Sequence, residues 1–324
     1  MLRFLAASLV VSVAVPALWR AERGRPPELE ALPAAAPLPF YYDLYSFRGD
    51  TGATAVVASF AVQAGRLDRE SVEGGVRYRF NVTFVVADTA DGIVARADDS
   101  VSVAVPRPLG GEHLLHAHLE TQAAPSTTTV GRIVMHAVPN PGTGQLYNHD
   151  FSIPDYGGSE LMLSDIALGL PDREGGWRRG EVTLALLPSS HFPGGPFDVY
   201  YEVYNLPQGT RYATEIAVEP VDGSGAPRAG AESTVRVRFA GESAADEADV
   251  LGELRRVDVP LELGPHRLTV TVTDLERGLS ASRSRILQVR EWEEGATLVL
   301  TCPVKPGIDR PGCPARAVTE GSRR

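Results

Sequence analysis

The residues whose types and spacing come nearest to a chemical site are two histidines and a glutamate near position 116. If this stretch forms a strand, His116, His118 and Glu120 share one face, because alternate residues of a strand point the same way. Two neutral imidazoles and one carboxylate at that spacing could hold zinc or copper. The same alternation also arises if the apolar residues between them face a core while the histidines face water. We favour the second interpretation and expect neither a bound metal nor another cofactor.

Other patterns that are typical of catalysis are weaker in this sequence. No Gly-x-Ser-x-Gly motif is present, and the adjacency of Ser190 and His191 says little, because the members of a catalytic triad come from distant positions. Several aspartates flank Asp91-Gly92, but they lack the alternate-residue oxygen ligands of a calcium loop. We therefore expect no catalytic residues and a protein that is not an enzyme.

Length and charge narrow the class of protein further. The chain has 324 residues, enough for two domains at about 150 residues each. With 31 basic and 41 acidic residues its formal net charge is −10, which argues against nucleic acid as a partner, because phosphate binding needs clustered Lys and Arg.

The N-terminal residues predict export. Arg3 precedes an apolar run from Phe4 to Leu18, and Val15-Pro16-Ala17 resembles a signal-peptide cleavage site. We expect residues 1–17 to be a signal peptide and residues 18–39 a flexible leader, with the protein in the periplasm, in the outer envelope or secreted. An uncleaved anchor is the alternative, although the apolar run falls short of the roughly 20 residues that span a bilayer. We expect no other transmembrane span.

Two cysteines near the C-terminus agree with export. Cys302 and Cys313 flank a stretch rich in Pro and Gly that can bend back on itself. A disulfide between them would be favoured in an oxidising compartment. We expect this bond in a C-terminal tail, residues 293–324.

Alternation of apolar and polar residues predicts an all-β fold. It is clearest from Val76 to Val86, and it recurs in short segments separated by Gly- and Pro-rich turns. The further strand candidates are 54–62, 128–138, 181–187, 197–206, 212–218, 234–239, 257–263, 267–273 and 285–289, and only 243–254 has the composition of a short helix. Many short strands at regular spacing indicate two tandem antiparallel, Ig-like β-sandwiches, residues 40–160 and 161–292.

One predicted strand, Phe197–Leu206, has a face that could bind a partner. Its apolar residues fall on one side, and Tyr200, Glu202 and Tyr204 fall on the other. Tyrosine suits both protein interfaces and sugar stacking. Either both rings are exposed and touch a partner, or a loop or the neighbouring domain covers them.

Three stretches resemble a known family. They are Leu163-Ser164-Asp165-Ile166-Ala167-Leu168, Tyr200-Tyr201-Glu202-Val203-Tyr204-Asn205-Leu206, and Gly264 with Leu268–Asp274. They are similar to the β-sandwich portion of bacterial exported proteins of the GWxTD-domain family. The naming motif is absent, because Gly176-Trp177 continues with Arg178-Arg179-Gly180, in a stretch that we expect to be an interdomain loop. The resemblance implies a β-sandwich fold and no particular reaction.

Together these features predict a non-catalytic exported protein with tandem sandwiches, protein-binding or scaffolding in the cell envelope. A carbohydrate-binding accessory module is one alternative, and a hydrolase or metal enzyme with a loop-built site is another. Sandwich folds host all three, so the fold does not decide between them. The expected partner is an envelope protein or a glycan.

Overall fold

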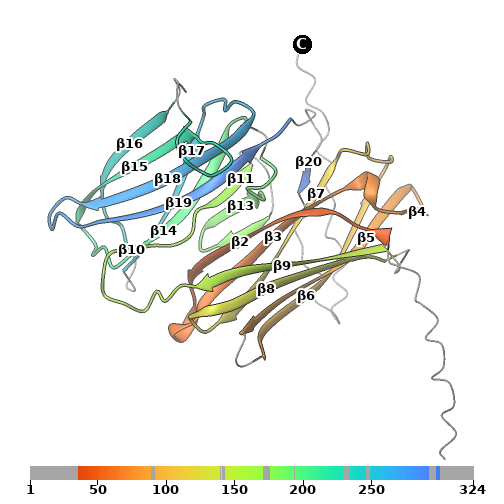
Figure 1. Cartoon of the computed structure of the whole chain (residues 1–324), viewed down its shortest axis with the longest axis horizontal. Coiled ribbons are helices and arrows are strands. Elements are labelled where there is room, and N and C mark those ends of the chain that lie inside the picture. Colours follow the sequence, from red (N-terminus) through yellow and green to blue (C-terminus); the bar gives the residue numbers. More distant parts are fainter. Residues whose placement is uncertain are drawn as a thin grey trace, which may run out of the picture. The chain divides into compact units, whose positions relative to one another are not determined.

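The computed structural model describes residues 36–88, 92–138, 140, 143–170, 176–192, 194–228, 234–245, 249–291 and 297–299 (Figure 1). The expected signal peptide, most of the leader and the Cys302–Cys313 pair lie outside the described residues.

The protein is all-β, as the alternation predicted. The described ranges contain strands and two short 3-10 turns, Asp50–Gly52 and Ala64–Arg66, and no α-helix. None of their helical segments is long and apolar enough to cross a membrane.

Two sheets form the first sandwich. Sheet I is built from β1 (Ala36–Pro37), β4 (Arg69–Val72), β5 (Gly75–Asp88), β6 (Gly92–Val105), β8 (Ser126–Ala137) and β9 (Thr143–Ile153). Sheet II is built from β2 (Phe40–Arg48), β3 (Thr54–Gln63), β7 (Leu114–Ala123) and β20 (Thr297–Val299). The pairs are antiparallel except β1 with β9 and β20 with β7.

Two further sheets form the second sandwich, and all their strand pairs are antiparallel. Sheet III is built from β10 (Met162–Leu163), β11 (Ala167–Leu170), β12 (Trp177–Arg179), β13 (Val182–Leu186), β14 (Phe197–Tyr204) and β17 (Val250–Val257). Sheet IV is built from β15 (Arg211–Pro220), β16 (Val235–Glu242), β18 (Gly264–Asp274) and β19 (Ser280–Val289).

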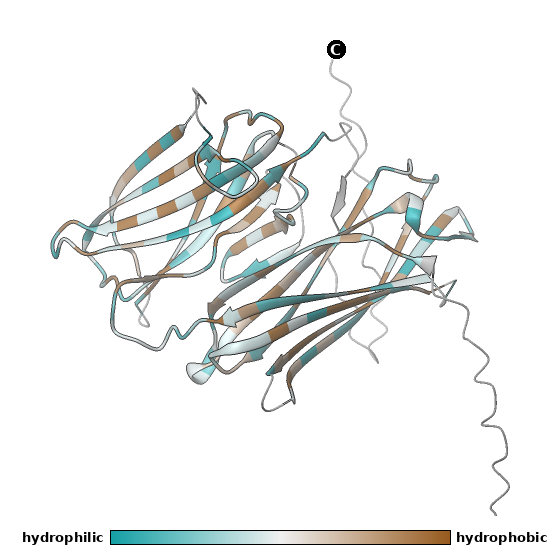
Figure 2. Ribbon diagram, viewed as in Figure 1, coloured by the Kyte–Doolittle hydropathy of each residue, from teal (hydrophilic) through white to brown (hydrophobic). Residues whose placement is uncertain are grey.

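The strands with a period of two are those that have one face in a core and the other in water. Every second residue of β15 and β18 is buried, and Figure 2 shows the matching bands of hydrophobic and hydrophilic residues along the strands of sheet IV. Removing one face from water while the other stays solvated stabilises this pattern in antiparallel sheets.

Three clusters of buried apolar side chains lie between the four sheets. The first fills sandwich 1 and runs from Leu38 to Ile153, and the second fills sandwich 2 and runs from Leu163 to Val289. The third joins Tyr45, Phe47, Ala55 and Val57 of sheet II to side chains of sheet III, among them Trp177 and Tyr200. Sheets II and III therefore pack against each other, and β3 and β14 are buried on both faces.

Three local expectations are corrected by the structure. The stretch expected to be a short helix, 243–254, contains the start of β17, which pairs with β14 along its whole length, while residues 258–263 form no strand. The acidic composition favours a helix, but pairing with β14 supplies the backbone hydrogen bonds that a helix would make internally. Trp177 does not lie in a loop, because β12 pairs with β13 and buries it between the sandwiches.

Candidate functional site

The face of β14 that was considered for partner binding lies against the first sandwich. Tyr200 and Tyr204 are only 2% and 0% exposed. The ring of Tyr200 lies 5.9 Å from that of Phe47 of β2, centroid to centroid. The hypothesis of an exposed binding face is therefore wrong for these tyrosines, and the neighbouring sandwich covers them.

Glu202 is the centre of a buried polar cluster on this face. Its carboxylate accepts hydrogen bonds from the hydroxyls of Tyr200 (2.8 Å) and Tyr204 (2.6 Å), which lie two residues before and after it on the strand. Arg179 of β12 donates to both carboxylate oxygens, Nε to Oε1 at 2.7 Å and Nη2 to Oε2 at 3.0 Å. A buried carboxylate is expensive unless it is paired and hydrogen-bonded, and these four bonds meet that requirement.

The same cluster reaches into the first sandwich. Arg179 also donates to the backbone carbonyl of Arg48 at the end of β2 (2.5 Å), and the amide of Arg48 donates to the Tyr204 hydroxyl (2.7 Å). The Arg48 guanidinium donates to Asn205 Oδ1 (3.1 Å) and lies over the Tyr204 ring, 4.4 Å from its centroid. These bonds tie the end of β2 to β12 and β14.

The electrostatics of this cluster oppose acid–base chemistry at neutral pH. Burial, followed by the charge of Glu202, raises the pKa of both Tyr200 and Tyr204. Burial alone would lower the pKa of Arg179, but the hydrogen bond and charge of Glu202 outweigh it and the pKa is raised. The two phenols and the guanidinium therefore keep their protons, and none of them can act as a nucleophile or a base.

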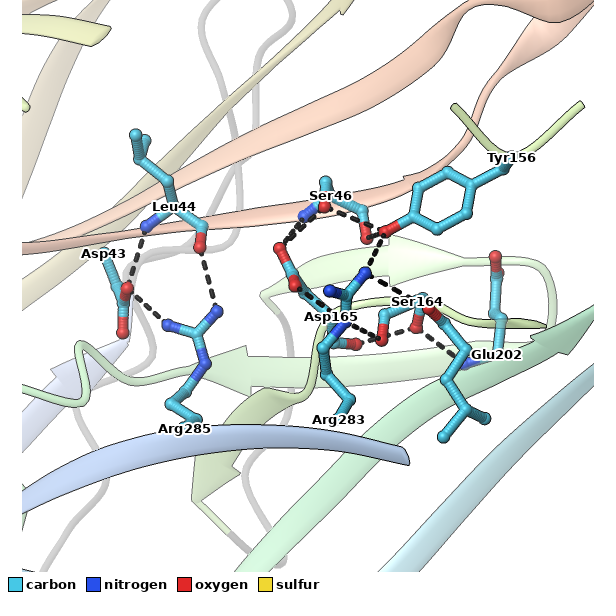
Figure 3. A network of polar contacts seen from close by, with 10 residues as sticks. Asp43, Leu44, Ser46, Tyr156, Ser164, Asp165, Glu202, Arg283 and Arg285 are labelled. Atoms are coloured by element: carbon cyan, nitrogen blue, oxygen red, sulfur yellow. Dashed lines mark hydrogen bonds and ion pairs between the residues drawn. The ribbon is translucent and has the colours of Figure 1, made fainter. Parts of the chain in front are cut away.

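A second set of polar contacts crosses the interface further along β2 (Figure 3). Asp43 accepts from Arg285 of β19 at 2.5 Å and from the amide of Ser189 at 3.0 Å. Arg285 donates in addition to the carbonyl of Leu44 at 3.0 Å. Both ionised side chains are only 14% exposed, so water screens this pair weakly.

Ser46 and Asp165 form a third connection, which Figure 3 also shows. The amide and the hydroxyl of Ser46 donate to Asp165 Oδ2 at 2.9 and 2.6 Å, and the amide of Asp165 donates to the carbonyl of Ser46 at 3.0 Å. The Tyr156 hydroxyl lies 3.0 Å from Ser46 Oγ, and the Arg283 Nε lies 3.5 Å from Asp165 Oδ1. Burial raises the pKa of Tyr156 to about 12, so it too stays protonated.

Two of the candidate metal ligands of β7, His116 and Glu120, also lie at this interface. Glu120 accepts a hydrogen bond from the indole of Trp177 at 2.9 Å. His116 is 1% exposed, and burial lowers its pKa to about 3, while burial lowers that of His118 to about 4. In the described part of the chain, no group of three or more His, Cys, Asp or Glu is arranged to hold a metal ion. The expectation that the histidines face water is wrong for His116.

Ser190 and His191 lie beside the first sandwich as well. The His191 ring stacks on Tyr41 of β2, with 4.1 Å between ring centroids and 16° between ring planes. Burial lowers the pKa of His191 to about 4. His191 is therefore a packing residue of the interface, and the Ser190 hydroxyl donates to the carbonyl of Tyr42 (3.5 Å).

Three arginines of these polar contacts, Arg179, Arg283 and Arg285, were not singled out from the sequence. Arg283 and Arg285 occupy positions on β19 that alternation assigns to the core side, beside Leu287 and Val289. Charges on the apolar side of a predicted strand are a usable signal, because such side chains need buried partners. No comparable signal marks Arg179, whose partner Glu202 lies on another strand.

No protein-family model and no curated protein matches this chain. Among solved structures, red sea bream transglutaminase is 12% identical, with 78% of this chain and 32% of that chain covered and a TM-score of 0.21. A Bacteroides uniformis β-glucuronidase is 8% identical, with 72% of this chain and 26% of that chain covered and a TM-score of 0.25. This chain thus spans a third or less of the length of these proteins, and the likeness carries no inference about activity.

Proposed function

We propose that this is an exported, non-catalytic protein whose two sandwiches act as one rigid body that binds or scaffolds a protein partner in the cell envelope. The observation that carries the proposal is the interface between sheets II and III. Apolar side chains of the two sheets form a continuous cluster there, and beside it Asp43 of sheet II pairs with Arg285 of sheet IV.

A rigid body favours binding because a preorganised surface loses less conformational entropy when a partner docks. An interface with only a few polar contacts would let the sandwiches move independently. Here Arg179 contacts the Arg48 carbonyl, Arg285 contacts Asp43, and Asp165 contacts Ser46, at separate points along β2, so hinge motion would break several buried bonds at once. The N-terminal signal pattern supports export.

Affinity isolation of the full tagged chain from gently solubilised envelope, with quantitative mass spectrometry, tests this function. We expect one protein to co-purify at a constant ratio to the bait across preparations. A matched bait with Arg285→Met, which loosens the interface without touching the outer faces, should retain less of it. Recovery of the chain without a stoichiometric partner, or turnover of a hydrolase substrate by the purified protein, would contradict the proposal.

A further inference from the structure

The solvent-facing side of sheet I carries a groove of about 400 Å³ along β5 and β6. Polar residues form the majority of its lining, although most of the surface that they and the two valines present to it is apolar: Arg77, Arg79, Asn81, Ser100, Val101, Ser102 and Val138. A volume of this size falls in the lower part of the range found for small-molecule sites.

The register of the two strands explains the groove. Arg77, Arg79 and Asn81 follow one another at alternate positions of β5, so they share the outer face. Opposite them on β6 stand Ala104, Ser102 and Ser100, whose side chains are short. A row of long side chains therefore runs beside a row of short ones, about 4.8 Å away, and leaves a trough along the strands.

The charge in the trough is positive, although the chain as a whole carries −10. Arg79 is neutralised by Glu70 of β4, to which its Nε donates at 2.9 Å. Glu70 lies opposite Arg77 in the β4–β5 register, but Arg77 makes no hydrogen bond or ion pair with any residue in the described ranges. Two guanidinium groups and one carboxylate leave one positive charge, which is centred on Arg77.

The other lining groups are neutral and bind hydroxyls well. Asn81 presents an amide, and its Oδ1 accepts from the Ser100 hydroxyl at 2.8 Å. Ser102 adds a second hydroxyl beside Arg79. No aromatic side chain lines the groove, so it lacks the stacking surface with which proteins usually bind neutral sugars.

We propose that this groove binds a monoanionic saccharide unit, a sugar that carries one carboxylate or one sulfate ester. Arg77 receives the anion through paired N–H donors, and Asn81, Ser100 and Ser102 bond the ring hydroxyls. A single net charge matches a monoanion, whereas a phosphate dianion would leave excess negative charge. The inference goes beyond the proposed scaffolding function and does not depend on it.

Native affinity electrophoresis of the full chain tests the site with three soluble polymers. Polygalacturonate supplies the carboxylate, dextran sulfate supplies the sulfate ester, and neutral dextran is the uncharged reference. We expect one charged polymer to retard the protein and dextran to leave its mobility unchanged. Arg77→Ala should weaken this binding by roughly tenfold or more, the range expected for a charge-assisted hydrogen bond.

Two further variants separate a built site from general attraction between charges. Arg132→Ala removes the same charge from β8 on the same sheet, where Arg132 donates to Asn148, and it should leave retardation unchanged. Ser102→Leu fills the trough without changing charge and should abolish binding, with the melting temperature checked in each variant. The proposal is overturned if neither charged polymer retards the chain, if dextran retards it equally, or if Arg132→Ala and Arg77→Ala have the same effect. Its failure would leave the co-purification of an envelope protein unaffected.

Discussion

Replacing Arg179 by methionine tests how strongly the polar cluster around Glu202 stabilises the second sandwich and its contact with β2. The side chain of Glu202 is 4% exposed, and Arg179 is its only cationic partner among the described residues. Methionine keeps most of the volume of the arginine stem but removes the charge and the bonds to Glu202 and to the Arg48 carbonyl. The variant therefore leaves a carboxylate buried with only its two tyrosine donors.

The expected loss of unfolding free energy is large. Removing one member of a buried ion pair typically costs about 3 to 5 kcal/mol, because the remaining charge stays desolvated without compensation. At about 2 to 4 °C per kcal/mol for a domain of 150 to 250 residues, the melting temperature should fall by roughly 6 to 20 °C. Differential scanning calorimetry of the full chain measures this directly.

Two controls make the result interpretable. Arg238→Met removes a surface partner of Glu215, where the arginine side chain is 76% exposed, and it should cost under about 1 kcal/mol. Adding Glu202→Gln to Arg179→Met removes the orphaned charge while keeping an acceptor for the tyrosines, so it should recover part of the stability. If Arg179→Met melts within about 2 °C of Arg238→Met, the two differ by no more than about 1 kcal/mol, and the buried pair does not supply the expected stability.

Three other perturbations test further contacts within the fold. Burial lowers the pKa of His116 to about 3, so the folded protein keeps this side chain neutral while the unfolded chain takes up a proton on acidification. Between pH 7 and pH 5 the free energy of unfolding should therefore fall by roughly 2 kcal/mol, a loss that a His116→Leu variant does not show. Urea unfolding measures both proteins, and equal pH dependence would contradict this. Tyr204→Phe removes a hydroxyl that donates to Glu202 and should destabilise by about 1.5 to 3 kcal/mol in the same assay, whereas no change would mean that the bond contributes nothing net. Gly176→Ala should destabilise the protein more than Gly264→Ala. Both glycines have φ near +116°, but only at Gly176 would the new Cβ lie 2.4 Å from a carbonyl oxygen. Thermal melting compares the two variants, and equal losses of stability would exclude the clash.

The sequence by itself determined most of the strands and the sorting of their faces. The alternation from Val76 to Val86 corresponds to β5, and that of Phe197–Leu206 places Tyr200, Glu202 and Tyr204 together on one face, where the structure has them. This succeeds because the period of two is a local property of extended backbone, which neighbouring residues set.

Only the tertiary structure decided what covers each face. A face with Tyr, Glu and Tyr has the composition of a solvated surface, and the fact that it is buried depends on Arg179 from another strand and on sheet II from the other sandwich. Asp43 and Arg285 are 242 positions apart, and Ser46 and Asp165 are 119 apart. No local pattern encodes such pairings. Each of these side chains is polar and is hydrated in the unfolded chain, and the partner that replaces water in the fold comes from a distant part of the sequence.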